Sequence, residues 1–277
     1  MLWLLVIALL GVALLAWGAF EAGWLRCRVL DVEIDGLPAE LDGIRIAHLS
    51  DFHLGVRSRG RVATEKAVNW VASRRPDLVC VTGDLASSQK GLRLLTELLR
   101  TLDRPYVILG NHDVAATKDP FSQPADLAQL GDVATLLRDA AATIEKAGRH
   151  IQLVGVDPRS YSARSARPWQ LADREADLRI LLCHFPGIER SLQPGVFHLV
   201  LAGHLHAGQI VVPHPGGRVS LAHPGSRFSS GLYTIEGGSM HISPGTGTTF
   251  VPFRFFARPE VTELVLHPAR PRVQQLT

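Results

Sequence analysis

Five polar clusters, each placed directly after a short apolar run, constrain the fold of this chain more than any other feature. In chain order they are Asp51-Phe52-His53, Gly83-Asp84, Gly110-Asn111-His112-Asp113, His184 and Gly203-His204-Leu205-His206. Short apolar runs predict buried strands, and polar side chains beside such strands cost free energy unless they have partners. Because ligand-binding groups in open α/β sheets gather beyond the carboxyl ends of the strands, we expect the five clusters to meet at one site.

Extended and helical patterns alternate along the first half of the chain and predict a layered α/β domain. The expected strands are 27–34, 43–49, 78–81 and 105–109, and the expected helices are 62–74 and 92–102. Further strands are expected at 151–156, 178–183 and 198–202, and in the glycine- and proline-rich region that follows them.

The segment from 115 to 148 is less regular, because Pro120 and Pro124 interrupt it. Its apolar residues after these prolines have helical spacing and predict an amphipathic helix; they are Leu127, Leu130, Val133, Leu136 and Leu137. Such a helix usually covers the core, and a cap over the substrate is the alternative.

The segment from Leu2 to Phe20 has no charged side chain, and as a helix it is long enough to span a bilayer. Trp3, Trp17 and Trp24 lie near its two ends, where interfacial aromatic residues are common. A cleaved signal peptide is the alternative, but no Lys or Arg precedes the apolar run and no clear cleavage site follows it. We therefore expect an uncleaved anchor at 1–25, a connecting segment with the first strand at 26–43, one domain at 44–270 and a tail at 271–277.

Basic residues and cysteines both favour the cytoplasmic side for the domain. Arg26 and Arg28 follow the apolar span, whereas no basic residue precedes it. Cys80 and Cys183 lie within apolar runs, and the total of three cysteines is odd, so a disulfide framework is not expected. The prediction is a single-pass protein of the inner (cytoplasmic) membrane with its domain on the cytoplasmic side.

The chemistry of the five clusters suits divalent metal ions. Residues two apart in an extended segment project to the same side, so Asp51 with His53, and His204 with His206, can each direct two ligands to one place. The mixed nitrogen and oxygen donors suit Mn²⁺, Fe²⁺ or Zn²⁺, and the sequence has no paired cysteines for a thiolate zinc site. The candidate ligands are too many for one tetrahedral ion and fit two ions that share a carboxylate; they are Asp51, His53, Asp84, Asn111, His184, His204 and His206.

The ordered series D-x-H, G-D, G-N-H-D, H and G-H-x-H resembles the signature of the calcineurin-like metallophosphoesterases, and the broader likeness runs from about Ile44 to Leu266. The resemblance implies a four-layer double β-sandwich flanked by helices. It assigns the first metal to four of the candidates, Asp51, His53, Asp84 and His206. It also implies that Asp84 bridges to a second metal completed by Asn111, His184 and His204. His112 matches the catalytic histidine, with Asp113 as its orienting partner.

The N-terminal apolar segment, the run from Leu201 to Gln209 and the run Ser243-Pro244-Gly245-Thr246-Gly247 resemble bacterial membrane-anchored members of this family. Some of these are similar to enzymes that cleave the pyrophosphate of UDP-2,3-diacylglucosamine in lipid A synthesis. Leu205 and Ala207 stand where Thr and Gly are common, and the segment after Asp113 follows no family pattern closely. These departures leave the substrate open.

The resemblance implies a phosphodiester or pyrophosphate hydrolase that acts through a metal-bound hydroxide, with Mn²⁺ as the first choice of metal. The expected substrate is a phosphate ester or a nucleoside-diphosphate lipid. The alternative is a non-catalytic metal-binding scaffold, although every matched position is filled. The net charge of +3 and the absence of an arginine-rich arm give no indication of nucleic acid binding, and the oligomeric state is left open.

Two further groups of residues have alternative interpretations. Phe250, Phe253, Phe255 and Phe256 are expected to be core, with membrane or acyl-chain contact as the alternative. Arg57, Arg59 and Arg61 are expected to be solvated, with steering of an anionic substrate as the alternative. The remaining histidines are expected to be structural; they are His48, His150, His198, His214, His223, His241 and His267.

Overall fold

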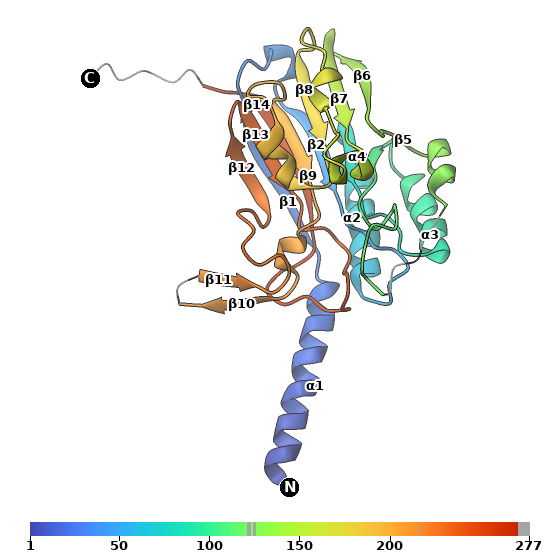
Figure 1. The fold of residues 1–277 in the computed structure, drawn as a ribbon, viewed down its shortest axis with the longest axis vertical. Helices are drawn as coiled ribbons and strands as arrows, with labels where there is room; N and C mark the ends of the chain where they lie inside the picture. The colour runs from blue at the N-terminus through green and yellow to red at the C-terminus, as the bar shows by residue number, and fades with distance from the viewer. Residues whose placement is uncertain (121–122, 124–125, 216, 271–277) are drawn as a thin grey trace, which may run out of the picture.

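The computed structural model describes residues 1–120, 123, 126–215 and 217–270. Within these residues the chain forms two six-stranded sheets, a two-stranded hairpin and a long N-terminal helix that projects from one end of the domain (Figure 1). The expected tail at 271–277 and Pro124 lie outside the described residues.

The first sheet has the order β1-β14-β2-β3-β4-β5. Its strands are β1 (Arg26–Ile34), β2 (Ile44–Leu49), β3 (Leu78–Thr82), β4 (Tyr106–Ile108), β5 (Thr135–Leu136) and β14 (Glu260–Pro268). Strands β2 to β5 are mutually parallel, and β14 runs antiparallel to β2 and parallel to β1. The carboxyl ends of β2, β3 and β4 therefore meet at one edge.

The second sheet has the order β12-β13-β9-β8-β7-β6. Its strands are β6 (Ala140–Lys146), β7 (Arg149–Gly155), β8 (Leu178–Leu182), β9 (Leu199–Ala202), β12 (Gly231–Ile235) and β13 (Gly238–Ile242). Strands β7, β8, β9 and β13 are parallel. The separate hairpin joins β10 (Val211–His214) to β11 (Gly217–Ser220).

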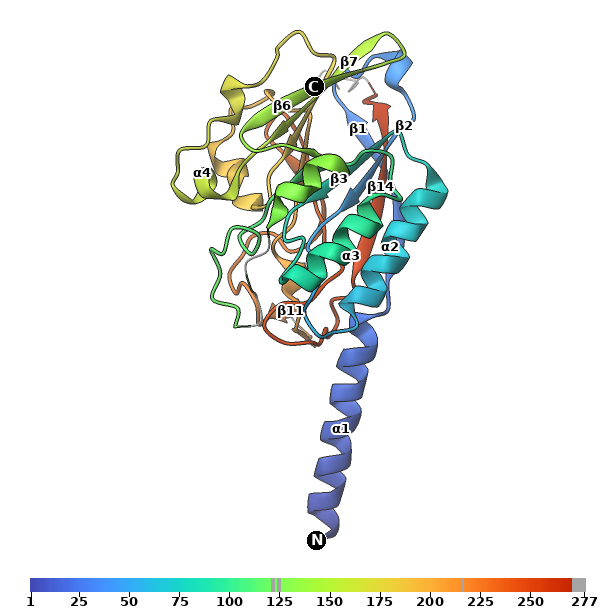
Figure 2. The same cartoon turned by 90° about the vertical axis from the view of Figure 1, so that its right-hand side faces the viewer.

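Buried apolar side chains hold the layers together. One cluster from the inner faces, including Ile46, Ile108 and Ile180, fills the space between the sheets. A second cluster packs helices α2 (Gly60–Arg74) and α3 (Gln89–Leu99) on the outer face of the first sheet (Figure 2). A third covers the outer face of the second sheet, beside α4 (Pro158–Ser162) and the short 3₁₀ helices Pro168–Gln170 and Pro186–Ser191. The predicted four-layer double β-sandwich is confirmed.

Helix α1 (Leu2–Ala22) is, among the described residues, the one helix long and apolar enough to cross a membrane. Its last turn packs against the domain: the backbone amide of Arg254 donates to the Gly18 carbonyl at 3.1 Å, and the amide of Ala257 donates to Glu21 Oε1 at 2.7 Å. The Arg258 guanidinium lies 3.7 Å from the ring centre of Trp24, at the same end of the helix.

Two sequence predictions of local structure are wrong. The expected amphipathic helix at Leu127–Leu137 is a short 3₁₀ helix, Leu127–Asp132, and β5 begins three residues later. Its buried Leu127 and Leu130 still cover the core beside α3, but pairing of β5 with β4 draws the following residues into the sheet. The sheet interaction prevails because it satisfies backbone groups at the edge of β4.

The prediction that the phenylalanine segment belongs to the core is the second wrong one. Phe250 and Phe256 are 49% and 54% exposed, and Phe253 and Phe255 are half-buried. The fully buried side chain of this segment is Arg254, because its guanidinium finds several backbone carbonyl acceptors in the loop 244–257.

Two of the histidines expected to be structural form a buried contact between the sheets. His48 Nδ1 of β2 lies 2.7 Å from His241 Nδ1 of β13, and His48 Nε2 lies 2.9 Å from Thr82 Oγ1. Burial lowers the pKa of His241 to about 3 and holds the pKa of His48 well below its usual range. Both imidazoles are therefore neutral in the folded protein near pH 7.

Acidification is expected to destabilise the protein through this pair. In the unfolded state the two imidazoles have a pKa of about 6.5 and bind protons below that pH, whereas in the folded state they stay neutral. Their contribution to the free energy of unfolding is therefore full above pH 6.5 and is lost as the pH falls toward 3. Two protons give a slope of about 2.7 kcal/mol per pH unit. In His241→Asn the change in the free energy of unfolding with pH should be smaller by about 1.4 kcal/mol per pH unit. Urea unfolding in detergent between pH 6 and 5 measures it. This range is centred about one unit below the pKa of the unfolded state. Equal slopes in the two proteins would contradict this account.

Candidate functional site

The structure brings the five predicted clusters together between the carboxyl ends of strands from both sheets. Asp51 and His53 follow β2, Asp84 follows β3, and the segment Gly110–Asp113 follows β4. From the second sheet, His184 follows β8, and the loop with His204 and His206 follows β9. The polar residues therefore meet because parallel strands of two facing sheets end at the same place.

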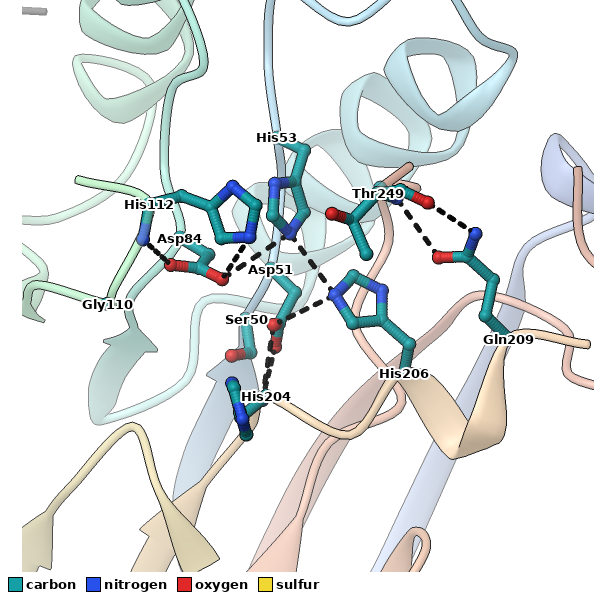
Figure 3. A network of polar contacts seen from close by, with 12 residues as sticks. Ser50, Asp51, His53, Asp84, Gly110, His112, His204, His206, Gln209 and Thr249 are labelled. Carbon is teal, nitrogen blue, oxygen red and sulfur yellow. Dashed lines mark hydrogen bonds and ion pairs between the residues drawn. The ribbon is translucent and has the colours of Figure 1, made fainter. Parts of the chain in front are cut away.

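Within the described part of the chain, one group that could hold a metal ion consists of Asp51, His53, Asp84 and His206. His206 Nε2 lies 3.3 Å from Asp51 Oδ1 and 3.1 Å from His53 Nε2, and His53 Nε2 lies 3.5 Å from Asp84 Oδ2. Figure 3 shows these side chains pointing toward one another. All four are buried. Converging oxygen and nitrogen atoms are costly to bury in an apolar environment, and a bound cation would stabilise them.

A second group contains Asp84, His184 and His204. His184 Nε2 lies 3.3 Å from Asp84 Oδ2, and His184 Nδ1 lies 2.7 Å from the Thr82 carbonyl oxygen, which fixes the ring. Asn111 Oδ1 is buried and has no hydrogen-bond partner among the described residues. A buried amide oxygen without a hydrogen-bond partner fits the chemistry of a metal ligand.

The backbone of both D-x-H and H-x-H motifs differs from the extended form that the sequence suggested. Asp51, His53, Asp84, His204 and His206 all have positive φ, between 44° and 74°. Such left-handed conformations are strained for non-glycine residues and cluster at functional sites. The members of each pair do converge, but they do so through tight turns and not through the alternation of a strand.

Glycines allow the backbone to approach the site carboxylates. A Cβ added at Gly110 would lie 2.1 Å from Asp84 Oδ1, and one added at Gly203 would lie 2.4 Å from Asp51 Oδ2. The amide of His112 donates to Asp84 Oδ1 at 2.9 Å, and the amide of His204 donates to both oxygens of Asp51 at 3.1 Å. The close approach therefore supplies hydrogen bonds that orient both carboxylates.

Burial and mutual charge set the protonation of the group. Burial would raise the pKa of Asp84, but the neighbouring His184 outweighs it and holds that pKa well below its usual range. Burial lowers the pKa of His53 and of His204 to about 3, so both imidazoles are neutral near pH 7. Asp84 outweighs burial at His184 and raises the pKa of that imidazole to about 9. Because neutral imidazoles and ionised carboxylates are the forms that bind metals, metal binding would release a proton from His184.

His112 lies at the edge of the first group, and its surroundings correct one prediction. Its Nε2 lies 3.2 Å from Thr117 Oγ1 and 3.9 Å from Asp84 Oδ2. Asp113, expected to orient His112, instead accepts hydrogen bonds at 2.8 Å from the amides of Leu85 and Gly110. Asp113 thus joins the β4 turn to the β3 turn, and among the described residues His112 Nδ1 has no hydrogen-bond partner.

Sequence reasoning missed two residues next to the site. Buried Arg254 donates to the Gly247 carbonyl at 2.7 Å and contacts His206 Nδ1 at 3.3 Å. It thus orients the His206 ring from the side opposite Nε2, the nitrogen that faces Asp51. His223 lies with its ring centre 4.8 Å from that of His204, although it was expected to be structural. No local motif marks either residue, since both reach the site from the irregular C-terminal region.

Comparisons with known proteins agree with this arrangement. A family model described as calcineurin-like phosphoesterase matches residues 44–208. A "Transmembrane protein with metallophosphoesterase domain" from Danio rerio is 35% identical over 265 residues, which cover 87% of this chain and 58% of that protein. The "Uncharacterized metallophosphoesterase YkoQ" of Bacillus subtilis (strain 168) is 28% identical, with 82% of this chain and 85% of that protein covered.

The "Phosphodiesterase YaeI" of Escherichia coli (strain K12) is 25% identical over 89% of this chain and 90% of its own length. The chain thus spans less than two thirds of the fish relative but most of the two bacterial ones. The family model covers more than half of the chain, including all five polar clusters up to His206. The chain therefore belongs to the calcineurin-like phosphoesterase family of metal-dependent phosphoric ester hydrolases.

Proposed function

We propose that this protein is a dinuclear-metal hydrolase of phosphodiesters or pyrophosphates that works at a membrane surface. The observation that carries the proposal is the pair of donor groups sharing Asp84. The buried Oδ1 of Asn111, which has no hydrogen-bond partner among the described residues, adds to it. The first metal is assigned to Asp51, His53, Asp84 and His206. The second is assigned to Asp84, Asn111, His184 and His204, and Mn²⁺ is the preferred ion, with Fe²⁺ or Zn²⁺ as alternatives.

Bound divalent ions in such a site lower the pKa of a water molecule and neutralise charge on the phosphate oxygens. The protein's own residues supply orientation and a proton. The His112 amide and ring both contact Asp84, and Thr117 Oγ1 is within hydrogen-bond distance of Nε2. We assign His112 as the group that donates a proton to, or stabilises the charge on, the leaving oxygen.

Helix α1 and the transmembrane-named relative support a membrane location. We propose a single-pass protein of the inner membrane with the domain on the cytoplasmic side, because Arg26 and Arg28 follow the span. As the specific activity, cleavage of the UDP-2,3-diacylglucosamine pyrophosphate is the candidate, since a lipid-linked nucleoside diphosphate would lie within reach of a site held at the bilayer.

The full chain in phosphatidylcholine nanodiscs, stripped of metal with a chelator, provides the test. We expect hydrolysis of bis(p-nitrophenyl) phosphate to return with Mn²⁺ and to saturate when about two ions are bound per chain. A panel with p-nitrophenyl phosphate and UDP-2,3-diacylglucosamine then separates monoester, diester and pyrophosphate activity. Metal binding without turnover across the whole panel would instead identify a non-catalytic scaffold.

A further inference from the structure

A cavity of about 360 Å³ lies directly beside the candidate metal groups. Its lining includes two histidines, His206 and His223, and five apolar residues, Ile210, Leu221, Ala222, Phe250 and Val251. His206 belongs to the first donor group, and the His223 ring packs on His204 of the second. We call this cavity the apolar groove.

The outer wall of the apolar groove is apolar and solvent-exposed. Leu221, Phe250 and Val251 are 60%, 49% and 36% exposed. Large apolar side chains that line a groove and face water together mark a surface that binds an apolar partner. An amphiphile with a phosphate at the metal groups would place its apolar part against these side chains.

Polar contacts hold this wall in place. The Gln209 side-chain amide donates to the carbonyl of Thr249 at 2.7 Å (Figure 3). It also donates to the carbonyl of Val251 at 3.1 Å. Buried Asp119 accepts from Thr249 Oγ1 at 2.7 Å and from the Phe250 amide at 3.0 Å. These hydrogen bonds hold the backbone of Phe250 and of its neighbours Thr249 and Val251. They therefore fix Phe250 in its exposed position.

The same loop joins the apolar groove to the membrane-spanning helix. Residues 249–251 form the groove wall, and a few residues later Arg254 and Ala257 make the hydrogen bonds to the end of α1. Figure 1 shows the hairpin β10–β11 and this loop at the end of the domain from which α1 emerges.

Tryptophan and arginine residues, which are common at the level of lipid headgroups, lie near the end of α1. One small hollow beside Phe256 is lined by two tryptophans, three arginines and one glutamate: Trp17, Trp24, Arg26, Arg218, Arg258 and Glu21. Tryptophan and basic side chains at the end of a span are typical of the bilayer interface. The groove therefore opens close to the level at which phosphate headgroups lie.

We infer that the apolar groove receives the alkyl or acyl chain of an amphiphilic phosphate ester drawn from the membrane, while the phosphate lies at the metal groups. This inference rests on the proposed function and adds its substrate class: phosphate esters that carry an apolar chain, in preference to short, fully soluble ones. Leu221, Phe250 and Val251 are the residues that set this preference.

Chain-length dependence of binding tests the inference without turnover. Ethyl, butyl and hexyl phosphate are titrated calorimetrically into the Mn²⁺-loaded full chain in phosphatidylcholine nanodiscs, with heats from empty nanodiscs subtracted. A fully buried methylene corresponds to about fourfold in Kd. Allowing for partial burial, we expect hexyl phosphate to bind about 10- to 200-fold more tightly than ethyl phosphate.

A matched pair of leucine variants locates the preference. Leu221→Gln should reduce the ratio of the ethyl to the hexyl Kd at least about fivefold, through lost apolar contact. Leu171→Gln changes a leucine of 37% exposure outside the groove lining and should leave the ratio as it is. Equal Kd values for the three ligands, or an unchanged ratio in Leu221→Gln, would overturn the inference.

Hydrolysis of p-nitrophenyl ethyl phosphate in the same nanodiscs separates this inference from the proposed function. Turnover of the ester without any chain-length preference in binding would leave the proposed function in place and overturn the groove assignment. Preferential binding of hexyl phosphate with no hydrolysis of any ester would support chain binding by the groove and contradict the hydrolase.

Discussion

Replacement of Asp84 by Asn is expected to remove both metals and to lower kcat/KM at least about 10³-fold. This is the rate equivalent of about 4 kcal/mol of transition-state stabilisation, and metal ions supply several kcal/mol of this kind. Asp84 Oδ2 lies 3.5 Å from His53 Nε2 in one group and 3.3 Å from His184 Nε2 in the other. No other residue of the described chain belongs to both groups. Asparagine keeps the size of the side chain but removes the charge, so the loss reports on metal binding and not on packing.

Metal content per chain, measured by plasma mass spectrometry alongside hydrolysis of bis(p-nitrophenyl) phosphate, checks the Asp84 prediction. Asp103→Asn is the matched control, because Asp103 is an exposed residue between α3 and β4. The control should retain both the metal and the rate. Full activity in Asp84→Asn with two bound ions would show that the shared carboxylate is not needed.

Replacement of His112 by Gln is expected to lower kcat about 10²- to 10⁴-fold for an ester with an alkoxide leaving group. The metals should remain bound, because His112 belongs to neither donor group. The loss should be much smaller for a p-nitrophenolate leaving group, since that anion leaves without needing a proton. The dependence on the leaving group therefore identifies a proton donor more specifically than the loss of rate does.

Parallel assays of a p-nitrophenyl diester and a dialkyl diester, with metal content measured on the same samples, check the His112 prediction. His150→Gln is the control, because His150 is an exposed residue on β7. Equal losses on the two esters would assign His112 a role in binding or metal retention and not in proton transfer.

The strands and the convergence of the five clusters could be predicted because both depend on local sequence. Each of the strands β2, β3, β4, β8 and β9 is a short, mostly apolar run. Parallel strands then bring their carboxyl ends to the same edge of the sheet. Burial of His53, Asp84 and His184 follows from the same placement.

What could not be predicted depends on partners far away in the chain. Asp113 turns to the amide of Leu85, and Arg254 becomes buried because carbonyl groups of the loop 244–257 surround it. His223 looks unpaired in the sequence and reaches His204 only through the path of the loop after β11. An apolar composition alone likewise suggested core for Phe250 and Phe256, which the fold leaves on the surface.

The contact between α1 and the loop before β14 has a consequence for how the protein can be divided. A Cβ at Gly18 would lie 2.4 Å from the ring of Phe255, and the Ala257 amide depends on Glu21 for its acceptor. Helix α1 therefore cannot be exchanged for any other apolar helix without changing these contacts. A replacement helix would need a glycine at position 18, or a shift of the Phe255 ring, and an acceptor at position 21. Helix α1 and the domain are therefore expected to fold as a single unit.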